Sequence, residues 1–263
     1  MNGNGKYRVL LVFGTRPEAI KMAPLVKEFQ KYPDDFETIV CVTGQHREML
    51  DQVLDLFGIT PDFDLDIMRA GQDLYSLTAS LIQELQPVIA QEKPDMVLVH
   101  GDTTTTMASS LAAYYGQSEV AHIEAGPRTG DKFSPFPEEI NRKIIGTLAS
   151  LHFAPTKTAA KPPSAENVDP ARIHVTGNTV IDALHWVTDR VAAEPSLASG
   201  LADIETRFAQ RRIIGVTSHR RENFGDDMEN IAEAIRRIAT REDVAVIFPV
   251  HLNPNVRKVM NER

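Results

Sequence analysis

The chain has 263 residues, with 28 Lys and Arg against 36 Asp and Glu, which gives a formal net charge of −8. Apolar residues make up 42% and charged residues 24%, proportions typical of a globular protein rather than a disordered or fibrous one. The acidic balance argues against bulk nucleic-acid binding, because phosphate backbones need clustered cations. Cys41 is the only cysteine, so neither a disulfide framework nor a cysteine zinc site can form.

The segment before Tyr7 is short and polar and lacks the layout of a signal peptide. No apolar run approaches the roughly 20 residues that cross a bilayer. We therefore expect a soluble protein of the cytoplasm.

Short β-rich runs alternate with helical patterns through the first part of the chain. The predicted strands are 7–13, 38–43, 95–100, 120–124, 151–154 and 173–175. The predicted helices are 18–30, 46–57, 74–91, 103–115, 137–149 and 180–191. Apolar strands that alternate with helices indicate an α/β fold, a parallel sheet covered on both faces with right-handed crossovers.

The composition changes at residues 192–209, which are rich in Ala, Glu and Ser and contain no predicted strand. This segment predicts a linker or a hinge helix. The alternation then resumes with strands 212–217 and 244–250, a helix near 228–238 and a helical stub after Pro254. We predict two domains, residues 1–195 and 196–263, of which the second has too few strands to bury both faces of its sheet.

Ligands of open parallel sheets bind in the loops at the carboxyl ends of the strands. In the loop Gly14–Glu18, Arg16 could hold a diphosphate at the helix N-terminus together with Lys21. The loop has no Walker lysine and no G-x-G-x-x-G spacing, so an ordinary Gly-Pro turn explains it equally well. In the loop His100–Thr106, Asp102 precedes consecutive threonines that begin a helix poorly, and such local inconsistency favours a functional site.

His122 and Glu124 end the next strand and repeat the spacing of His100 and Asp102. Because side chains alternate along a strand, each histidine and its acid are expected on one face. Three interpretations stay open: a divalent-metal hydrolase using all four groups, a carboxylate pair for acid–base chemistry with structural histidines, or helix caps without chemistry. Further polar loops are 131–142, a candidate lid, 218–223 and 251–255.

Eight segments, taken together, match one family in order along nearly the whole chain. They are FGTRPEAIKMAPLV, VTGQHREMLDQVL, PDMVLVHGDTTTT, HIEAG, RTGDKFSPFPEEINR, VTGNTVIDAL, HRRENFG and PVHLNPNVR. In these segments the chain resembles the bacterial non-hydrolysing UDP-N-acetylglucosamine 2-epimerases. The resemblance implies the GT-B architecture: two Rossmann-like domains with parallel sheets, the second incomplete here, and the nucleotide sugar in the cleft between them.

The activity implied by the resemblance is reversible conversion of UDP-N-acetylglucosamine to UDP-N-acetylmannosamine, with no cofactor and no metal. UDP leaves and a base removes the proton of sugar C2, giving 2-acetamidoglucal. C2 is then protonated on the other face as UDP returns. Carboxylates stabilise the cationic ring and move protons, and cations stabilise the departing diphosphate. Two alternatives stay open: a hydrolysing relative that releases UDP and N-acetylmannosamine, and an inactive fragment of the epimerase.

The resemblance also assigns roles to residues. The implied catalytic residues are Asp102, Glu124, Glu138 and His219. The implied substrate-binding residues are Arg16, Lys21, Asp102, Glu124 and His219. A regulatory UDP-sugar site is implied at Gln45, Glu138, Arg220 and His251. The implied partners are the two UDP-sugars and a second copy in a homodimer, with no nucleic acid and no membrane, in cell-envelope polysaccharide biosynthesis.

The sequence departs from the family pattern in three places. It ends at Arg263, where members continue, so we expect this chain to bind UDP-N-acetylglucosamine weakly and not to epimerise it detectably. Pro127 stands beside Glu124 where members usually carry leucine, and it removes an N–H. The run Lys161–Ser164 interrupts a segment that is continuous helix in members, and we expect residues 158–168 to lie away from the loops of the site.

Overall fold

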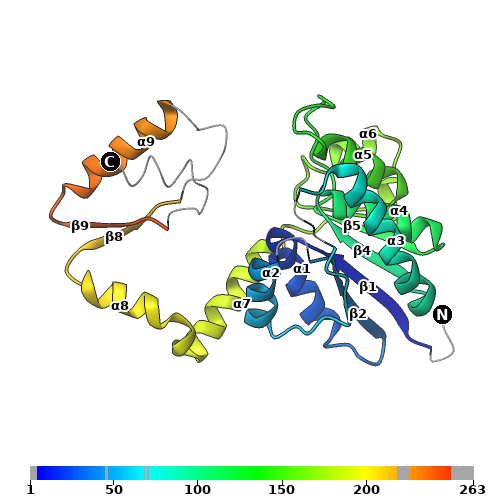
Figure 1. The fold of residues 1–263 in the computed structure, drawn as a ribbon, viewed down its shortest axis with the longest axis horizontal. Coiled ribbons are helices and arrows are strands. Elements are labelled where there is room, and N and C mark those ends of the chain that lie inside the picture. The colour runs from blue at the N-terminus through cyan, green and yellow to red at the C-terminus, as the bar shows by residue number, and fades with distance from the viewer. Residues whose placement is uncertain (1–4, 45–46, 68, 70, 218–225, 250–263) are drawn as a thin grey trace. The chain divides into compact units, whose positions relative to one another are not determined.

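The computed structural model describes residues 5–44, 47–67, 69, 71–217 and 226–249. The chain divides into two compact units, Met1–Arg190 and Val191–Arg263. Both units contain parallel strands and helices (Figure 1).

The first unit is built on a seven-stranded sheet in the order β3-β2-β1-β4-β5-β6-β7, and all of its strand pairs are parallel. The strands are β1 (Tyr7–Phe13), β2 (Phe36–Val42), β3 (Phe63–Asp64), β4 (Met96–His100), β5 (Glu119–Ile123), β6 (Leu151–Ala154) and β7 (Ile173–Val175). The strand order reverses between β1 and β4, and ligands of doubly wound sheets bind at such a reversal, beyond the carboxyl ends of the strands.

The helices of this unit follow the predicted alternation. They are α1 (Arg16–Phe29), α2 (Arg47–Phe57), α3 (Leu74–Glu92), α4 (Thr104–Tyr115), α5 (Glu138–Leu148), α6 (Lys161–Ala165) and α7 (Val180–Ala193), with a 3₁₀ turn η1 (Pro170–Arg172) before β7. Every strand and helix that we predicted before residue 192 is present, with ends shifted by at most two residues. The short elements β3, α6 and η1 were not predicted.

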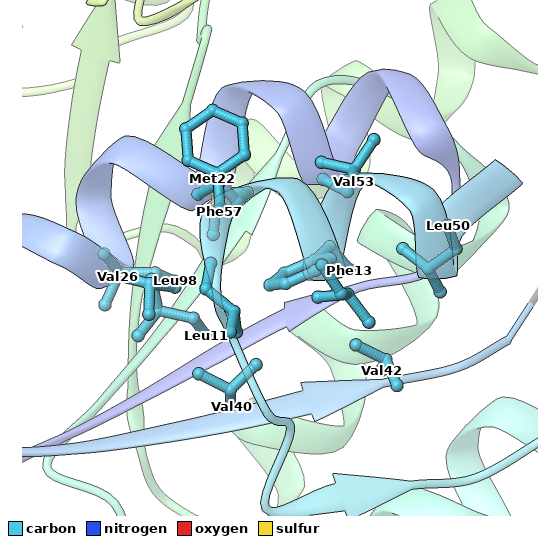
Figure 2. Close-up of a cluster of buried hydrophobic side chains, with 14 of the residues drawn as sticks. Leu11, Phe13, Met22, Val26, Val40, Val42, Leu50, Val53, Phe57 and Leu98 are labelled. Atoms are coloured by element: carbon cyan, nitrogen blue, oxygen red, sulfur yellow. The ribbon is translucent and has the colours of Figure 1, made fainter. Parts of the chain in front are cut away.

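Two layers of helices cover the sheet, one on each face (Figure 1). On one face, Leu11 and Phe13 of β1 pack with α1 and α2, and Figure 2 shows this layer. On the other face, Leu10 and Val12 pack with α3, α4 and α5. Burying each large apolar side chain stabilises the fold by about 1.5–3 kcal/mol. Because helices pack on both faces of β1, the position of this strand and of the loop that follows it is fixed.

The second unit is smaller. It contains the 3₁₀ turn η2 (Pro195–Ala198), α8 (Ser199–Arg207), β8 (Arg212–Gly215), α9 (Asp226–Ala239) and β9 (Val244–Ile247). The strands β8 and β9 pair in parallel, and α8 lies in the segment for which we predicted a linker or a hinge helix. The helical stub predicted after Pro254 lies outside the described residues. Within the described ranges, no helix is both long enough and apolar enough to span a bilayer.

Candidate active site at the carboxyl ends of β1, β4 and β5

The loops after β1 and β4 are joined through one buried carboxylate, that of Glu18. Its Oε2 accepts hydrogen bonds from the amides of Gly14 at 2.8 Å and Thr15 at 2.7 Å, while the Thr15 hydroxyl caps the amide of Glu18. Its Oε1 accepts a hydrogen bond from the Thr103 hydroxyl at 2.5 Å. The side chain is 2% exposed, so Glu18 is structural. The T-x-x-E spacing of a capping box is the sequence signal that could have identified this role.

The threonine run after Asp102 is explained by the start of α4. Thr103 is the N-cap residue and accepts a hydrogen bond from the amide of Thr106 at 3.1 Å. The hydroxyl of Thr106 lies 2.5 Å from the carbonyl oxygen of His100. The threonines therefore fix the turn that carries Asp102, and the poor helix propensity is offset by these bonds.

Glu124 lies at the centre of the described site. Its Oε2 accepts hydrogen bonds from Lys21 Nζ and from His100 Nε2, the latter at 2.9 Å. Burial by itself raises the pKa of this carboxyl, but the bonds from His100 and Lys21 outweigh it and hold the pKa at about 2. Glu124 is therefore ionised at neutral pH. Its φ of 61° is a strained conformation of the kind that concentrates at functional sites.

His122 has a different role from the one that the strand pattern suggested. The alternation that we used to pair it with Glu124 ends at Ile123, the last residue of β5. His122 is 1% exposed, and its Nε2 lies 2.7 Å from the carbonyl oxygen of Gly101. Burial lowers the pKa of His122 to about 3, so the ring is neutral and braces β5 against the end of β4. Of the two histidines, His100 is the one that contacts a predicted catalytic acid.

Asp102 is held by two consecutive residues of α5. Its carbonyl oxygen accepts a hydrogen bond from Asn141 Nδ2 at 2.8 Å. Its Oδ2 lies 2.8 Å from Arg142 Nε and 2.6 Å from Arg142 Nη2. Arg142 Nη1 also donates to the carbonyl oxygen of Glu124 at 3.4 Å. Neither Asn141 nor Arg142 was among the site residues predicted from the sequence.

Glu138 and Glu139 begin α5 and differ in surroundings. Glu139 is 1% exposed and accepts hydrogen bonds from the amides of Thr129 at 2.9 Å and Gly130 at 3.1 Å. Burial raises the pKa of Glu139, and these amide bonds outweigh it, so the pKa lies below its ordinary value. Glu138 Oε2 is buried, and no described residue forms a hydrogen bond with it. Glu138 lies one turn before Arg142 and therefore on the same side of the helix.

The remaining predicted residues divide into two groups. Arg16 is exposed and, within the described part of the chain, has no hydrogen bond or ion pair that occupies its guanidinium. Gln45, His219, Arg220 and His251 lie outside the described residues. Among the residues that the structure does describe, no three His, Cys, Asp or Glu side chains cluster as a metal-ligand set would.

Residues 158–168 contact the loop after β5, so our expectation that they lie away from the site is wrong. A Cβ atom added to Gly126, whose φ is +123°, would lie 1.8 Å from the carbonyl oxygen of Ala159. Arg128 pairs with Glu166 through Nε at 2.9 Å and Nη2 at 2.7 Å. The same guanidinium donates to the carbonyl of Pro127 at 3.0 Å. This segment therefore buttresses the turn that follows Glu124.

Known proteins resemble this chain over nearly its whole length. The family profile described as UDP-N-acetylglucosamine 2-epimerase matches residues 27–263. The Escherichia coli O157:H7 protein named UDP-N-acetylglucosamine 2-epimerase is 56% identical over 256 residues, which are 97% of this chain and 68% of that protein. The Bacillus subtilis protein of the same name is 52% identical over 98% of this chain and 66% of its own length.

Solved structures give the same result. The Neisseria meningitidis UDP-GlcNAc 2-epimerase bound to UDP-GlcNAc superposes with a TM-score of 0.85 at 46% identity, covering 97% of this chain and 69% of that one. The Methanocaldococcus jannaschii enzyme in complex with UDP-GlcNAc and UDP has a TM-score of 0.72 at 30% identity, covering 97% and 68%.

The α/β fold matches nucleotide-sugar enzymes of the GT-B type, and acids and cations gather at its strand-order reversal. Within that class, this chain belongs to the UDP-N-acetylglucosamine 2-epimerase family. It is an isomerase by family and spans about two thirds of the length of the relatives that it matches.

Proposed function

We propose that the chain interconverts UDP-N-acetylglucosamine and UDP-N-acetylmannosamine reversibly, without net hydrolysis. This proposal replaces the expectation that the chain does not epimerise the sugar detectably, which rested on where the sequence ends. The observation that carries the proposal is the meeting of Glu124, Lys21 and His100 at one carboxylate oxygen, beside the Asp102–Arg142 pair. Cations and carboxylates at a strand-order reversal suit a substrate with an anionic diphosphate and a sugar that becomes cationic.

The proposed reaction begins with cleavage of the bond between sugar C1 and the diphosphate oxygen. UDP departs with the bonding electrons, and the positive charge at C1 acidifies the hydrogen on C2. A base removes that proton, and the electrons of the C–H bond form the C1–C2 double bond of 2-acetamidoglucal. A proton then adds to the opposite face of C2 while the UDP oxygen bonds again to C1, so C2 is inverted and no water is consumed.

The surroundings of the carboxylates suggest how the roles divide. Glu124, with a pKa of about 2, is a permanent anion at neutral pH and suits stabilisation of the cationic ring. Glu138 has a buried oxygen to which no described residue hydrogen-bonds, so no described group occupies this oxygen in place of the substrate. We therefore assign one of the two proton transfers at C2 to Glu138, and the transfer on the opposite face requires a second group. Arg16, exposed at the first turn of α1, is available to bind the diphosphate.

The remaining roles follow from the resemblance to the family. They are a place for His219 over the diphosphate, a regulatory UDP-sugar site at Gln45, Glu138, Arg220 and His251, a homodimer, a cytoplasmic location and a contribution to cell-envelope polysaccharide biosynthesis. The division of the chain into domains near residue 195 belongs to the same proposal.

Product analysis tests the proposed reaction. The chain is incubated with UDP-N-acetylglucosamine, and proton NMR follows the sugar anomeric signals. We expect UDP-N-acetylmannosamine to accumulate to a constant ratio, and the same ratio to be reached from UDP-N-acetylmannosamine. Free N-acetylmannosamine with stoichiometric UDP would instead show a hydrolysing enzyme. A Glu138→Gln variant should be inactive, whereas Glu84→Gln, a change at an exposed acid of α3, should behave as the unchanged chain.

A further inference from the structure

Arg142 links the two loops that carry the predicted catalytic acids. Its Nε and Nη2 contact Oδ2 of Asp102 at 2.8 Å and 2.6 Å. Its Nη1 donates to the main-chain carbonyl of Glu124 at 3.4 Å. One guanidinium thus bonds to the loop after β4 and to the residue that follows β5, and its side chain is only 15% exposed.

The guanidinium is itself held in place by α5 and its surroundings. Asn141, the preceding residue, donates to the carbonyl oxygen of Asp102 at 2.8 Å. The main-chain carbonyl of Arg142 accepts a hydrogen bond from Arg128 Nη2 at 3.4 Å. Asn141 and Arg142, in one turn of α5, therefore fix both the main chain and the side chain of Asp102. Arg128 in turn holds the main chain of Arg142.

Arg142 differs from Arg16 in that its N–H groups donate to atoms of the protein. Arg16 is exposed, and the described residues leave its guanidinium open to an anion. In Arg142, the Nε and both terminal nitrogens already donate to Asp102 or Glu124. An arginine whose fork is used in this way orients its acceptors rather than binding a diphosphate.

We infer that Arg142 is a positioning residue for the reaction proposed above, on which this inference rests: it fixes the carboxylate of Asp102 relative to the main chain of Glu124. A group that stabilises a developing charge is effective when it is oriented in advance, because no reorganisation is then needed during the reaction. A lysine cannot replace the planar fork, since a single ammonium cannot make the same set of bonds to both loops.

The kinetic test compares Arg142→Met and Arg142→Lys with the unchanged chain. We expect Arg142→Met to lower kcat about 100-fold, the scale of a misplaced catalytic group, while KM for UDP-N-acetylglucosamine changes by less than about threefold. Arg142→Lys should recover part of kcat. The control is Arg241→Met, which removes an exposed arginine–aspartate pair and should leave kcat unchanged. A raised KM with an unchanged kcat would make Arg142 a substrate ligand and overturn the inference.

A double variant tests whether Arg142 acts through Asp102. Asp102→Asn combined with Arg142→Met should be no slower than Asp102→Asn alone, because the group that is positioned has already been altered. If the fold-loss in kcat of the double variant equalled the product of the losses in the two single variants, the inference would be contradicted.

Hydrogen exchange gives a readout that does not need the reaction. In Arg142→Met, and to a smaller extent in Arg142→Lys, amide exchange in residues 101–106 and 123–127 should quicken, with no such change in Arg241→Met. If the unchanged chain shows no epimerisation, the proposed function fails, and the exchange data still decide the positioning role. Unchanged exchange in these two segments would overturn it.

Discussion

Glu138 and Glu139 are neighbours in the sequence, yet only Glu139 has its carboxylate satisfied by backbone amides. Glu139 accepts hydrogen bonds from Thr129 and Gly130, whereas Glu138 Oε2 is buried without a hydrogen bond from the described residues. An unsatisfied buried oxygen costs folding free energy, and natural proteins keep such costs mainly at functional sites.

Exchanging each glutamate for glutamine should separate these roles. Glu138→Gln should lower kcat at least about 100-fold, the scale of losing a general acid or base, with little change in the free energy of unfolding. Glu139→Gln should lower the free energy of unfolding by about 1–3 kcal/mol, because one of its amide bonds loses its acceptor. Urea unfolding and steady-state kinetics on the same samples measure both effects. Equal loss of stability in the two variants would contradict the assignment.

The hydrogen bonds that Glu124 accepts from His100 and Lys21 together predict a pH-dependent contribution to stability. The pKa of Glu124 is lowered from 4.5 to about 2, so the native state holds this carboxyl ionised where the unfolded state protonates it. The contribution is fully present above about pH 4.5 and is lost as the pH falls through about 2, and it amounts to about 3 kcal/mol.

Lys21→Met should therefore lower the free energy of unfolding most above pH 4.5, and the difference from the unchanged chain should shrink toward pH 2. Urea titrations across this range measure it. The control is Lys31→Met, since Lys31 pairs with Glu28 at the surface, where such pairs contribute little. A difference that does not vary with pH would contradict the assigned pairing.

His122 should make the stability of the fold fall at a higher pH than the one at which the contribution of Glu124 is lost. Burial lowers the pKa of His122 from 6.5 to about 3. Between these two pH values the unfolded state binds a proton at this ring and the native state does not. Stability therefore falls as the pH drops from 6.5 toward 3. His122→Gln keeps a donor for the Gly101 carbonyl and removes the titration, so its stability should vary less over this window. His185→Gln, at an exposed position of α7, should retain the dependence of the unchanged chain.

Arg128 should matter more for stability than its partner Glu166. Arg128 is 10% exposed and bonds to backbone carbonyls as well as to Glu166, whose side chain is 36% exposed. Arg128→Met should therefore destabilise the chain more than Glu166→Gln, and a double-mutant cycle should give a coupling energy of about 1 kcal/mol or less. If Glu166→Gln lowered the free energy of unfolding as much as Arg128→Met in urea unfolding, the bonds from Arg128 to backbone carbonyls would not contribute to stability, and the prediction would be wrong.

Much of the fold could be predicted from the sequence, because its elements are long and strongly patterned. The apolar run Tyr7–Phe13 is both the predicted strand and the observed β1, since a buried parallel strand needs apolar residues on both faces. The two-residue β3 is too short to show any period. The helix α6 contains two prolines near its start, where a missing N–H costs nothing, so what resembled an interruption is a helical turn.

The loops at the strand ends indicated some of the site residues, and the resemblance to the family assigned their roles. Lys21 and Glu124 were predicted that way, and the structure brings them together. Arg142 and Glu18 act through contacts with residues 40 and 85 positions away in the sequence. Strand alternation and helix capping do not encode the pairing of Glu18 with Thr103 or of Arg142 with Asp102, although the T-x-x-E spacing could have identified Glu18 as part of a capping box.

The fate of the hydrogen at sugar C2 tests the proposed reaction most directly. The chain is incubated with UDP-N-acetylglucosamine in D₂O, and mass spectrometry and NMR measure deuterium at C2 in both UDP-sugars. We expect one deuterium at C2 of UDP-N-acetylmannosamine and of the recovered UDP-N-acetylglucosamine, with both sugars still bonded to UDP. Epimerisation without deuterium at C2, or release of free N-acetylmannosamine as the main product, would contradict the proposed elimination and re-addition of UDP.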